Sequence, residues 1–195
     1  DIAVAWDPGS LTATFTFPNY AGGLLPDGVY QARILGGLPD FFGNPAPDGP
    51  FYTFVWSAGT GANDTFRVAL NPSTLDYEVY LNDPNTPAFL AGQGTAKIVL
   101  FGAAGSDSMQ IDLSGGNPIT PDGLSLVGGD DSDTLAVVGS AAADDVTFNG
   151  GDLTINGSVA DHAQFESFTF DGGGGPAWDA LTVNAGRVGI ASTQY

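Results

Sequence analysis

The stretch from residue 124 to 138, LSLVGGDDSDTLAVV, constrains the fold more than any other part of the chain. Its two ends alternate apolar residues with small or polar ones, which predicts two half-buried β-strands. Between them, Gly128 and Gly129 can adopt the backbone angles of a sharp corner, and Asp133 and Thr134 offer oxygens that can accept hydrogen bonds from backbone N–H groups. We therefore expect strand, corner and strand, with an architectural rather than a catalytic role.

Aspartate-led strands of the same kind recur along the chain. They begin at Asp64, Asp107 and Asp145 and, more loosely, at Asp179. Two candidate hairpins, over 64–81 and 145–155, also share one plan. We interpret these segments as a long unit that occurs twice with different loop lengths. Repeated units that cannot bury their apolar faces alone must stack, so the pattern predicts a β-solenoid-like domain or stacked hairpins.

The amino-acid composition supports an all-β fold. The chain has 195 residues, of which 43% are hydrophobic, and it contains 29 Gly and 13 Pro. A chain of this size can bury a substantial core in one large or two small domains. Abundant glycine and proline together with many aromatic and β-branched residues are typical of short strands that tight turns connect.

The charge excludes two classes of partner. There are 22 acidic residues against four basic ones, which gives a net charge of −18. So few basic groups cannot neutralise a phosphate backbone, and an acidic surface is repelled by nucleic acid and by anionic lipid. We therefore expect no binding of nucleic acid and no insertion into a membrane.

The sequence also bears on the location of the protein. It has no cysteine, so neither disulfides nor thiol chemistry can occur, and it contains no apolar run of transmembrane length. Many large secreted bacterial proteins lack cysteine. Because the chain begins with Asp1 and not Met, we expect that a preceding segment was removed. A secreted or cell-surface location is the resulting prediction.

Residues 1–58 contain four strand candidates, over 2–6, 11–17, 29–35 and 51–56. In the second, apolar residues that include Phe15 alternate with threonines, which predicts one buried and one solvated face. The run LPDGVY at 25–30 follows the alternating segment 12–17 and precedes GNP at 43–45 and FYTF at 51–54. Together these residues resemble the second half of a bacterial immunoglobulin-like domain. The resemblance implies that the hydroxyl of Tyr30 fixes a corner, although ordinary packing of Tyr30 in a strand is the alternative.

This block is short for such a domain. An immunoglobulin-like sandwich has about seven strands in roughly 100 residues, and only four or five can be found here. We therefore predict an incomplete immunoglobulin-like domain over 1–58, followed by a Gly/Asp-rich repeat β-domain over 59–195.

Residues 59–190 resemble the glycine–aspartate repeat regions of large secreted bacterial surface proteins. The likeness extends loosely to calcium-binding nonapeptide-repeat proteins, in which corner carboxylates hold Ca²⁺ between successive turns. The segment 128–136, GGDDSDTLA, matches the nonapeptide pattern except that Asp131 replaces the third glycine. No second copy follows nine residues later, so a regular calcium-binding roll is not expected.

The resemblance makes Asp130, Asp131 and Asp133 the candidate ligands for Ca²⁺. Three carboxylates close together are unfavourable unless a cation or water separates them. The alternative is that each is a solvated turn or capping residue. For Asp64, Asp107 and Asp179, and for the pair Asp144 and Asp145, the turn interpretation is favoured.

Catalysis is not expected. His162 is the only histidine, which excludes a cluster of histidine ligands, and its surroundings predict an exposed loop. Trp6 and Trp56 lie in strand candidates and are expected in the core. Trp178 lies between a proline-containing turn and Asp179, so it is the one candidate platform for a sugar ring.

The sequence therefore predicts a non-enzymatic structural and interaction module of an extracellular protein. Such a module is expected to belong to a fibre, through head-to-tail self-association, or to a longer multidomain chain. In either case, the first strand candidate, over 2–6, is expected to pair outside residues 1–195. The alternative is a module that binds or tethers polysaccharide, with Trp178 and the acidic corners as its contacts.

Overall fold

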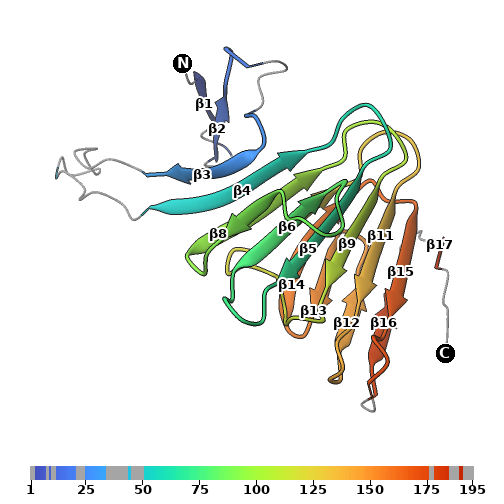
Figure 1. The fold of residues 1–195 in the computed structure, drawn as a ribbon. Helices are drawn as coiled ribbons and strands as arrows, with labels where there is room; N and C mark the ends of the chain where they lie inside the picture. The colour runs from blue at the N-terminus through green and yellow to red at the C-terminus, as the bar shows by residue number, and fades with distance from the viewer. Residues whose placement is uncertain are drawn as a thin grey trace.

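The computed structural model describes residues 3–7, 9, 12–20, 25–33, 44, 51–175, 178–184 and 189–190. These residues form strands, turns and bends without a helix, which confirms the predicted all-β class. Two large sheets face each other, and a two-stranded hairpin lies beside one end of them (Figure 1). Along much of the chain, successive strands alternate between the two large sheets.

Three groups of strands are hydrogen-bonded side by side. The separate hairpin consists of β1 (Ala3–Asp7) and β2 (Thr12–Thr16). The eight-stranded sheet has the order β16 (Ala180–Val183), β12 (Asp145–Phe148), β13 (Asp152–Ile155), β14 (Ser158–Ala163), β10 (Leu124–Val127), β8 (Thr95–Phe101), β4 (Tyr52–Ala58), β3 (Gly28–Ala32). The seven-stranded sheet has the order β17 (Gly189–Ile190), β15 (Ser167–Asp171), β11 (Thr134–Val138), β9 (Ser108–Asp112), β5 (Thr65–Leu70), β6 (Tyr77–Leu81), β7 (Phe89–Ala91).

The chain winds from one sheet to the other through short corners. Strands β4, β8 and β10 are parallel neighbours in the first sheet, and each is followed by its counterpart in the second, β5, β9 and β11. Each such pair of strands is called a coil here. Antiparallel hairpins, β5–β6 and β12–β13, extend the sheets at two points. Both were predicted from the sequence.

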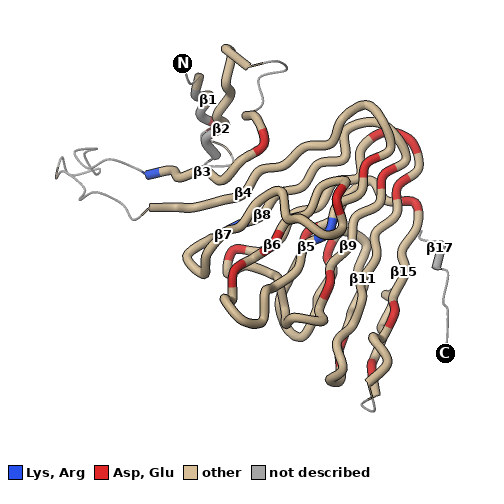
Figure 2. Tube along the Cα trace, in the orientation of Figure 1, with Lys and Arg blue, Asp and Glu red and all other residues tan. Residues whose placement is uncertain are grey.

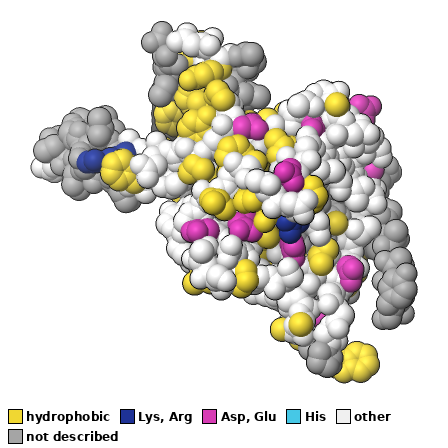
Figure 3. Space-filling model, in the orientation of Figure 1, with side chains coloured by type: hydrophobic (Ala, Val, Ile, Leu, Met, Phe, Trp, Pro, Cys, Tyr) yellow, Lys and Arg dark blue, Asp and Glu magenta, His cyan; other side chains and the backbone are white. Residues whose placement is uncertain are grey.

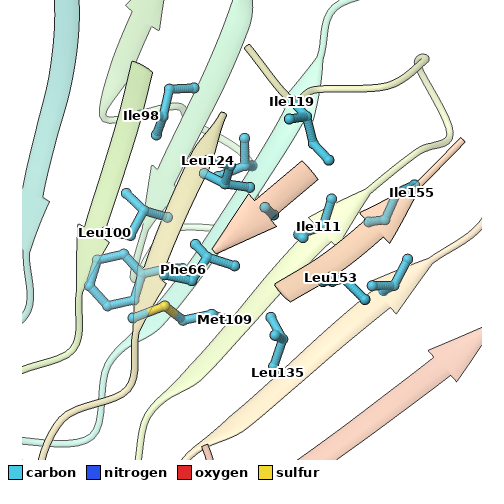
Figure 4. Close-up of a cluster of buried hydrophobic side chains, with 14 of the residues drawn as sticks. Phe66, Ile98, Leu100, Met109, Ile111, Ile119, Leu124, Leu135, Leu153 and Ile155 are labelled. Atoms are coloured by element: carbon cyan, nitrogen blue, oxygen red, sulfur yellow. The ribbon is translucent and has the colours of Figure 1, made fainter. Parts of the chain in front are cut away.

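The core lies between the two sheets, because every second side chain of each strand points inward. Figure 4 shows these side chains converging from both sheets. Fully burying one Leu, Ile or Phe contributes about 1.5–3 kcal/mol. The largest fully buried side chains include Phe168, Ile98, Leu100, Met109, Ile111, Leu124, Leu126, Leu135, Leu153 and Ile155. Most belong to the strands whose alternating pattern predicted an inward face.

The first part of the chain is joined to the coils by β4. This strand pairs antiparallel with β3 on one side and parallel with β8 on the other. The boundary predicted at residue 58 therefore falls at the end of a strand that belongs to the large sheet. The division of the chain into two domains stays a prediction.

The turn before β3 has the contact that the resemblance implied. The hydroxyl of Tyr30 donates to the carbonyl oxygen of Pro26 at 2.5 Å. In the same turn, Asp27 accepts hydrogen bonds from the Ser57 hydroxyl at 3.1 Å and from the Ala58 N–H at 2.8 Å. The turn is thus fixed to its own strand and to the end of β4. Membership of an immunoglobulin-like family stays a prediction.

The first strand finds a partner within the chain. We expected it to pair outside residues 1–195, but β1 is hydrogen-bonded to β2 over five residue pairs, from Ala3 with Thr16 to Asp7 with Thr12. The turn between them is short enough to close a hairpin, and the N–H of Gly9 donates to Asp7. On β2, Phe15 is exposed together with Thr14 and Thr16, so the expected buried face of this strand was wrong.

Candidate functional site

Three corners at one end of the strands share one sequence pattern, a glycine followed five residues later by an aspartate. They connect β4 to β5, β8 to β9 and β10 to β11. Acidic residues gather along this edge of the molecule in successive corners (Figure 2). The pairs are Gly59 with Asp64, Gly102 with Asp107, and Gly128 with Asp133. Each of these three aspartates is buried.

Three buried aspartates and the exposed Glu166 connect one coil to the next. The backbone N–H of Asp64 donates to Oδ1 of Asp107, and the N–H of Asp107 donates to Oδ1 of Asp133, both at 2.7 Å. The N–H of Asp133 donates in turn to Oε2 of Glu166 at 2.7 Å. We call these four residues the carboxyl ladder. At the sharp corners these backbone N–H groups have no partner in the sheet, and the carboxyl oxygens of the ladder accept their hydrogen bonds instead.

The glycines of these corners are required by close approach. A Cβ atom on Gly102 would lie 2.0 Å from the carbonyl oxygen of Gly128 and 2.3 Å from Oδ2 of Asp107. On Gly128 it would lie 2.0 Å from the carbonyl oxygen of Gln164 and 2.6 Å from Oδ2 of Asp133. Adjacent coils can therefore stack only where these corners lack a side chain.

The adjacent Gly129 combines close approach with an unusual backbone angle, since a Cβ atom there would lie 2.2 Å from the carbonyl oxygen of Ala103. Gly129 has φ +118° and Asp131 has φ +79°, both in the left-handed region. A positive φ is therefore found at the position where the nonapeptide pattern has a glycine, and aspartate tolerates this conformation better than most residues.

An asparagine closes the first end of the ladder. Asn82 accepts the N–H of Thr65 at 2.8 Å and donates through Nδ2 to Oδ1 of Asp64 at 2.5 Å. Its own φ is +57°. Asn82 therefore donates to Asp64 the hydrogen bond that Asp107 and Asp133 each receive from a backbone N–H of the neighbouring coil.

A second, shorter ladder lies between the corners β11–β12 and β15–β16. The N–H of Asp144 donates to Oδ1 of Asp179 at 2.9 Å. Asn156 accepts the N–H of Asp145 and donates to Oδ1 of Asp144, both at 2.8 Å, with φ +50°. Here Asp144 is the buried corner carboxylate, whereas Asp145, with which the sequence pattern began, is exposed.

The pKa values of the buried aspartates in the carboxyl ladder are shifted in opposite directions. Burial raises the pKa of Asp107 and of Asp133 above the ordinary value, and nearby carboxylates add to the effect, although an N–H donor acts against it. In both residues Oδ2 is buried without a hydrogen-bond partner in the described part of the chain. Burial also acts on Asp64, but hydrogen bonds from Asn82 and Thr60 outweigh it and lower its pKa.

The three predicted calcium ligands do not point to one place. Asp133 is buried in the ladder, whereas Asp130 and Asp131 are exposed, and Oδ2 of Asp131 accepts the N–H of Gly105 at 3.3 Å. Within the described ranges, no group of three or more His, Cys, Asp or Glu residues could hold a metal ion. The alternative of a solvated turn residue fails for Asp133. Calcium binding at this corner stays a prediction.

The structure corrects the prediction for His162. The residue lies on β14 and is buried, because it alternates with exposed neighbours on that strand. Its ring is 4.5 Å from the ring of Phe148, and Nε2 is 3.1 Å from the carbonyl oxygen of Asn149. Burial lowers the pKa of His162, against the effects of Asn149 and of nearby carboxylates. A neutral histidine in the core is the result.

The tryptophans differ in exposure. Trp178 is 93% exposed, as a sugar platform requires, and its neighbour Asp179 belongs to the second ladder. Trp56 lies on β4 and is half-buried, with a buried indole N–H that has no partner among the described residues. The side chain of Trp6 lies outside the described residues.

A surface groove of about 600 Å³ lies beside β14. It is lined by Tyr77, Asp122, Ser158, Val159 and Asp161, among others. Asp161 forms an ion pair with Lys97 at 3.4 Å. The groove combines hydroxyl and carboxylate groups with apolar contacts, which is the kind of lining that a small polar ligand needs.

Comparison with known proteins adds no family. The chain matches no protein-family model, no curated protein and no solved structure. In the part of the chain that the structure describes, no helix is long and apolar enough to cross a membrane. The geometry of the corners and of the sheet edges therefore carries the functional interpretation.

Sequence reasoning missed three residues of the two ladders. Glu166 is the fourth member of the carboxyl ladder but lacks the preceding glycine at the usual spacing. Asn82 and Asn156 each follow the second strand of a hairpin, immediately after Leu81 and Ile155. Their shared position after two hairpins of the same plan was the signal that could have found them.

Proposed function

We propose that this chain is a non-enzymatic structural and interaction module of an extracellular or cell-surface protein, built into a fibre or a longer chain. The observation that carries the proposal is the carboxyl ladder. Its acidic side chains are turned into the corners, where they accept backbone N–H groups of neighbouring coils. Side chains that hold coils together in this way are not free for general acid–base chemistry.

The surface is consistent with such a role. Basic side chains are scarce and acidic ones are dispersed over the face in Figure 3, which favours solubility and disfavours nucleic acid as a partner. Sedimentation velocity of the whole chain over a range of concentrations in 0.5 M NaCl tests the proposal. We expect species larger than the monomer, since salt screens the net charge of −18. A monomer at every concentration counts against assembly from copies of this chain.

A polysaccharide-binding or tethering module is the second candidate, and the 93% exposure of Trp178 favours it. An exposed indole can stack on a sugar ring and costs little to desolvate. A glycan array with the wild-type chain and Trp178→Ala tests this candidate. Binding that the substitution abolishes supports it, and an array without signal removes it.

A further inference from the structure

We propose that copies of this chain join head to tail through the two edge strands of the eight-stranded sheet, so that β16 of one copy pairs with β3 of the next. The inference rests on the proposed function, because it names the surface through which the module assembles. The partner is a second copy of the chain, since both complementary edges occur on it.

Both edges offer unused backbone groups. Among the described residues, β3 is hydrogen-bonded only to β4, and β16 only to β12. An edge strand exposes a row of N–H and C=O groups that another strand can pair with. The hairpin β1–β2 forms its own sheet and is not hydrogen-bonded to β3.

Each edge also leaves a core-facing side chain uncovered. On β3, Val29 pairs with the fully buried Val55, and on β16, Leu181 pairs with the fully buried Val146. Val29 is nevertheless 44% exposed and Leu181 36% exposed, because each has a strand on one side only. From Val29, the inward row runs through the fully buried Val55, Ile98, Leu124, Ala160 and Leu153 to Phe148 and ends at the half-buried Val183 on β16. Leu181 begins a neighbouring inward row, which continues through the fully buried Val146 and Ile155. A strand docked at either edge would therefore extend the buried inward face of the sheet.

The strand directions fit this contact. Strand β16 runs parallel to β12, and β12 runs in the direction of β14, β10, β8 and β4, whereas β3 runs opposite to β4. Copies that stack in one orientation therefore bring β16 and β3 together as an antiparallel pair. The contact joins two different surfaces, so it does not close on itself and propagates into a fibre.

The charge of the chain decides when this assembly occurs. A net charge of −18 on each copy repels a second copy at low ionic strength, and the Debye length falls from about 30 Å at 0.01 M salt to about 3 Å at 1 M. Association through apolar edge residues and backbone groups should therefore strengthen as NaCl is added.

Paired substitutions of the whole chain test the proposal by sedimentation velocity in 0.5 M NaCl. Leu181→Lys places a charge on the inward side of β16, and Val29→Lys does the same on β3. Thr182→Lys and Ala32→Lys are the matched controls, because these exposed residues are on the opposite faces of the same two strands. We expect each inward substitution to weaken association at least tenfold and each control to leave it within about twofold of wild type.

Mixing the two inward variants gives the sharpest outcome. Val29→Lys keeps an intact β16 edge and Leu181→Lys keeps an intact β3 edge, so an equimolar mixture should form two-chain species that grow no further. Melting curves like that of the wild type confirm that all variants are folded. If both inward variants associate as the wild type does, the head-to-tail contact is wrong. The contact is also wrong if the inward variants stay monomeric when mixed. Neither result contradicts self-assembly through another surface. A wild-type chain that remains monomeric overturns this contact together with self-assembly.

Discussion

Asp107 donates its backbone N–H to Oδ1 of Asp133 at 2.7 Å, although 26 residues separate them along the chain. Both side chains are buried at equivalent corners of adjacent coils. The same bond links Asp64 to Asp107. A carboxyl oxygen in this role accepts a backbone N–H in the region where a sharp corner interrupts the sheet.

The substitution Gly102→Ala tests the close approach of the coils. The added Cβ would lie 2.0 Å from the carbonyl oxygen of Gly128, which is backbone and cannot rotate away. We expect a loss of about 3 kcal/mol or more in the free energy of unfolding, the upper range for overpacking. Gly61→Ala in the preceding corner is the control, since its Cβ would meet nothing within 4 Å. Equal effects of the two substitutions in urea unfolding would refute the role given to Gly102.

Asp133→Asn tests the raised pKa of the ladder carboxyl. Because the folded state holds this proton more tightly than the unfolded state, Asp133 should contribute less stability as the pH rises from the unfolded pKa through the folded pKa. Asparagine keeps an oxygen for the N–H of Asp107 and replaces the partnerless Oδ2 by a neutral amide. We expect a gain in the free energy of unfolding at pH 7, because the amide is neutral and avoids the cost of burying a charged carboxylate.

The difference between the wild type and Asp133→Asn should depend on pH in one direction. Urea unfolding at pH 4 and pH 7 measures it, and groups with lowered pKa, such as Asp64, contribute equally to both chains. The advantage of the variant should shrink toward pH 4. An advantage that grows as the pH falls would mean that the pKa of Asp133 is lowered.

Asn82→Asp tests the end of the ladder. The substitution keeps the shape of the side chain and tolerance for positive φ, but it replaces the Nδ2 donor by a carboxylate oxygen against Asp64. Loss of a hydrogen bond to a charged group costs about 1.5–3 kcal/mol. Asn85→Asp, at an exposed position in the following loop, is the control. A thermal melt in which both variants match the wild type would contradict the capping role.

Calcium addition tests the prediction from the nonapeptide resemblance. If the corner 128–136 binds Ca²⁺, an ion concentration of a hundred times the dissociation constant stabilises the fold by about 2.7 kcal/mol. The exposed Asp130 and Asp131 are the ligands that the structure leaves accessible, so Asp131→Asn should reduce the gain. Superimposable melting curves with Ca²⁺ and with chelator would leave these aspartates as turn residues.

Much of the fold could be predicted from local pattern. The alternation of apolar residues located the strands β10 and β11 and both hairpins, because the period of two directly reports which face is buried. The hydroxyl contact of Tyr30 also followed from a short motif. Which strands pair could not be predicted, because β5, β6 and β7 separate the parallel partners β4 and β8 along the chain, and local alternation does not report distant pairing.

The site was harder to predict than the strands. A lone aspartate after a glycine corner is typical of a solvated turn, and only the stacked neighbour makes Asp107 and Asp133 buried acceptors. His162 was misplaced for a similar reason. The nearby Asp161 and Gln164 suggested a loop, but Asp161 points out of β14 and Gln164 follows it, while the imidazole packs on Phe148.

Amide hydrogen exchange of the wild-type chain, followed residue by residue by NMR, tests the carboxyl ladder most directly. The N–H groups of Asp64, Asp107 and Asp133 donate to carboxyl groups of the next coil, so they should exchange only through opening of the stack. The exposed Asn63 and Ser132, one residue before two of them, provide the reference. We predict that the three ladder amides exchange at least a thousandfold more slowly than these neighbours. Exchange of the ladder amides at the rate of Asn63 and Ser132 would contradict the account.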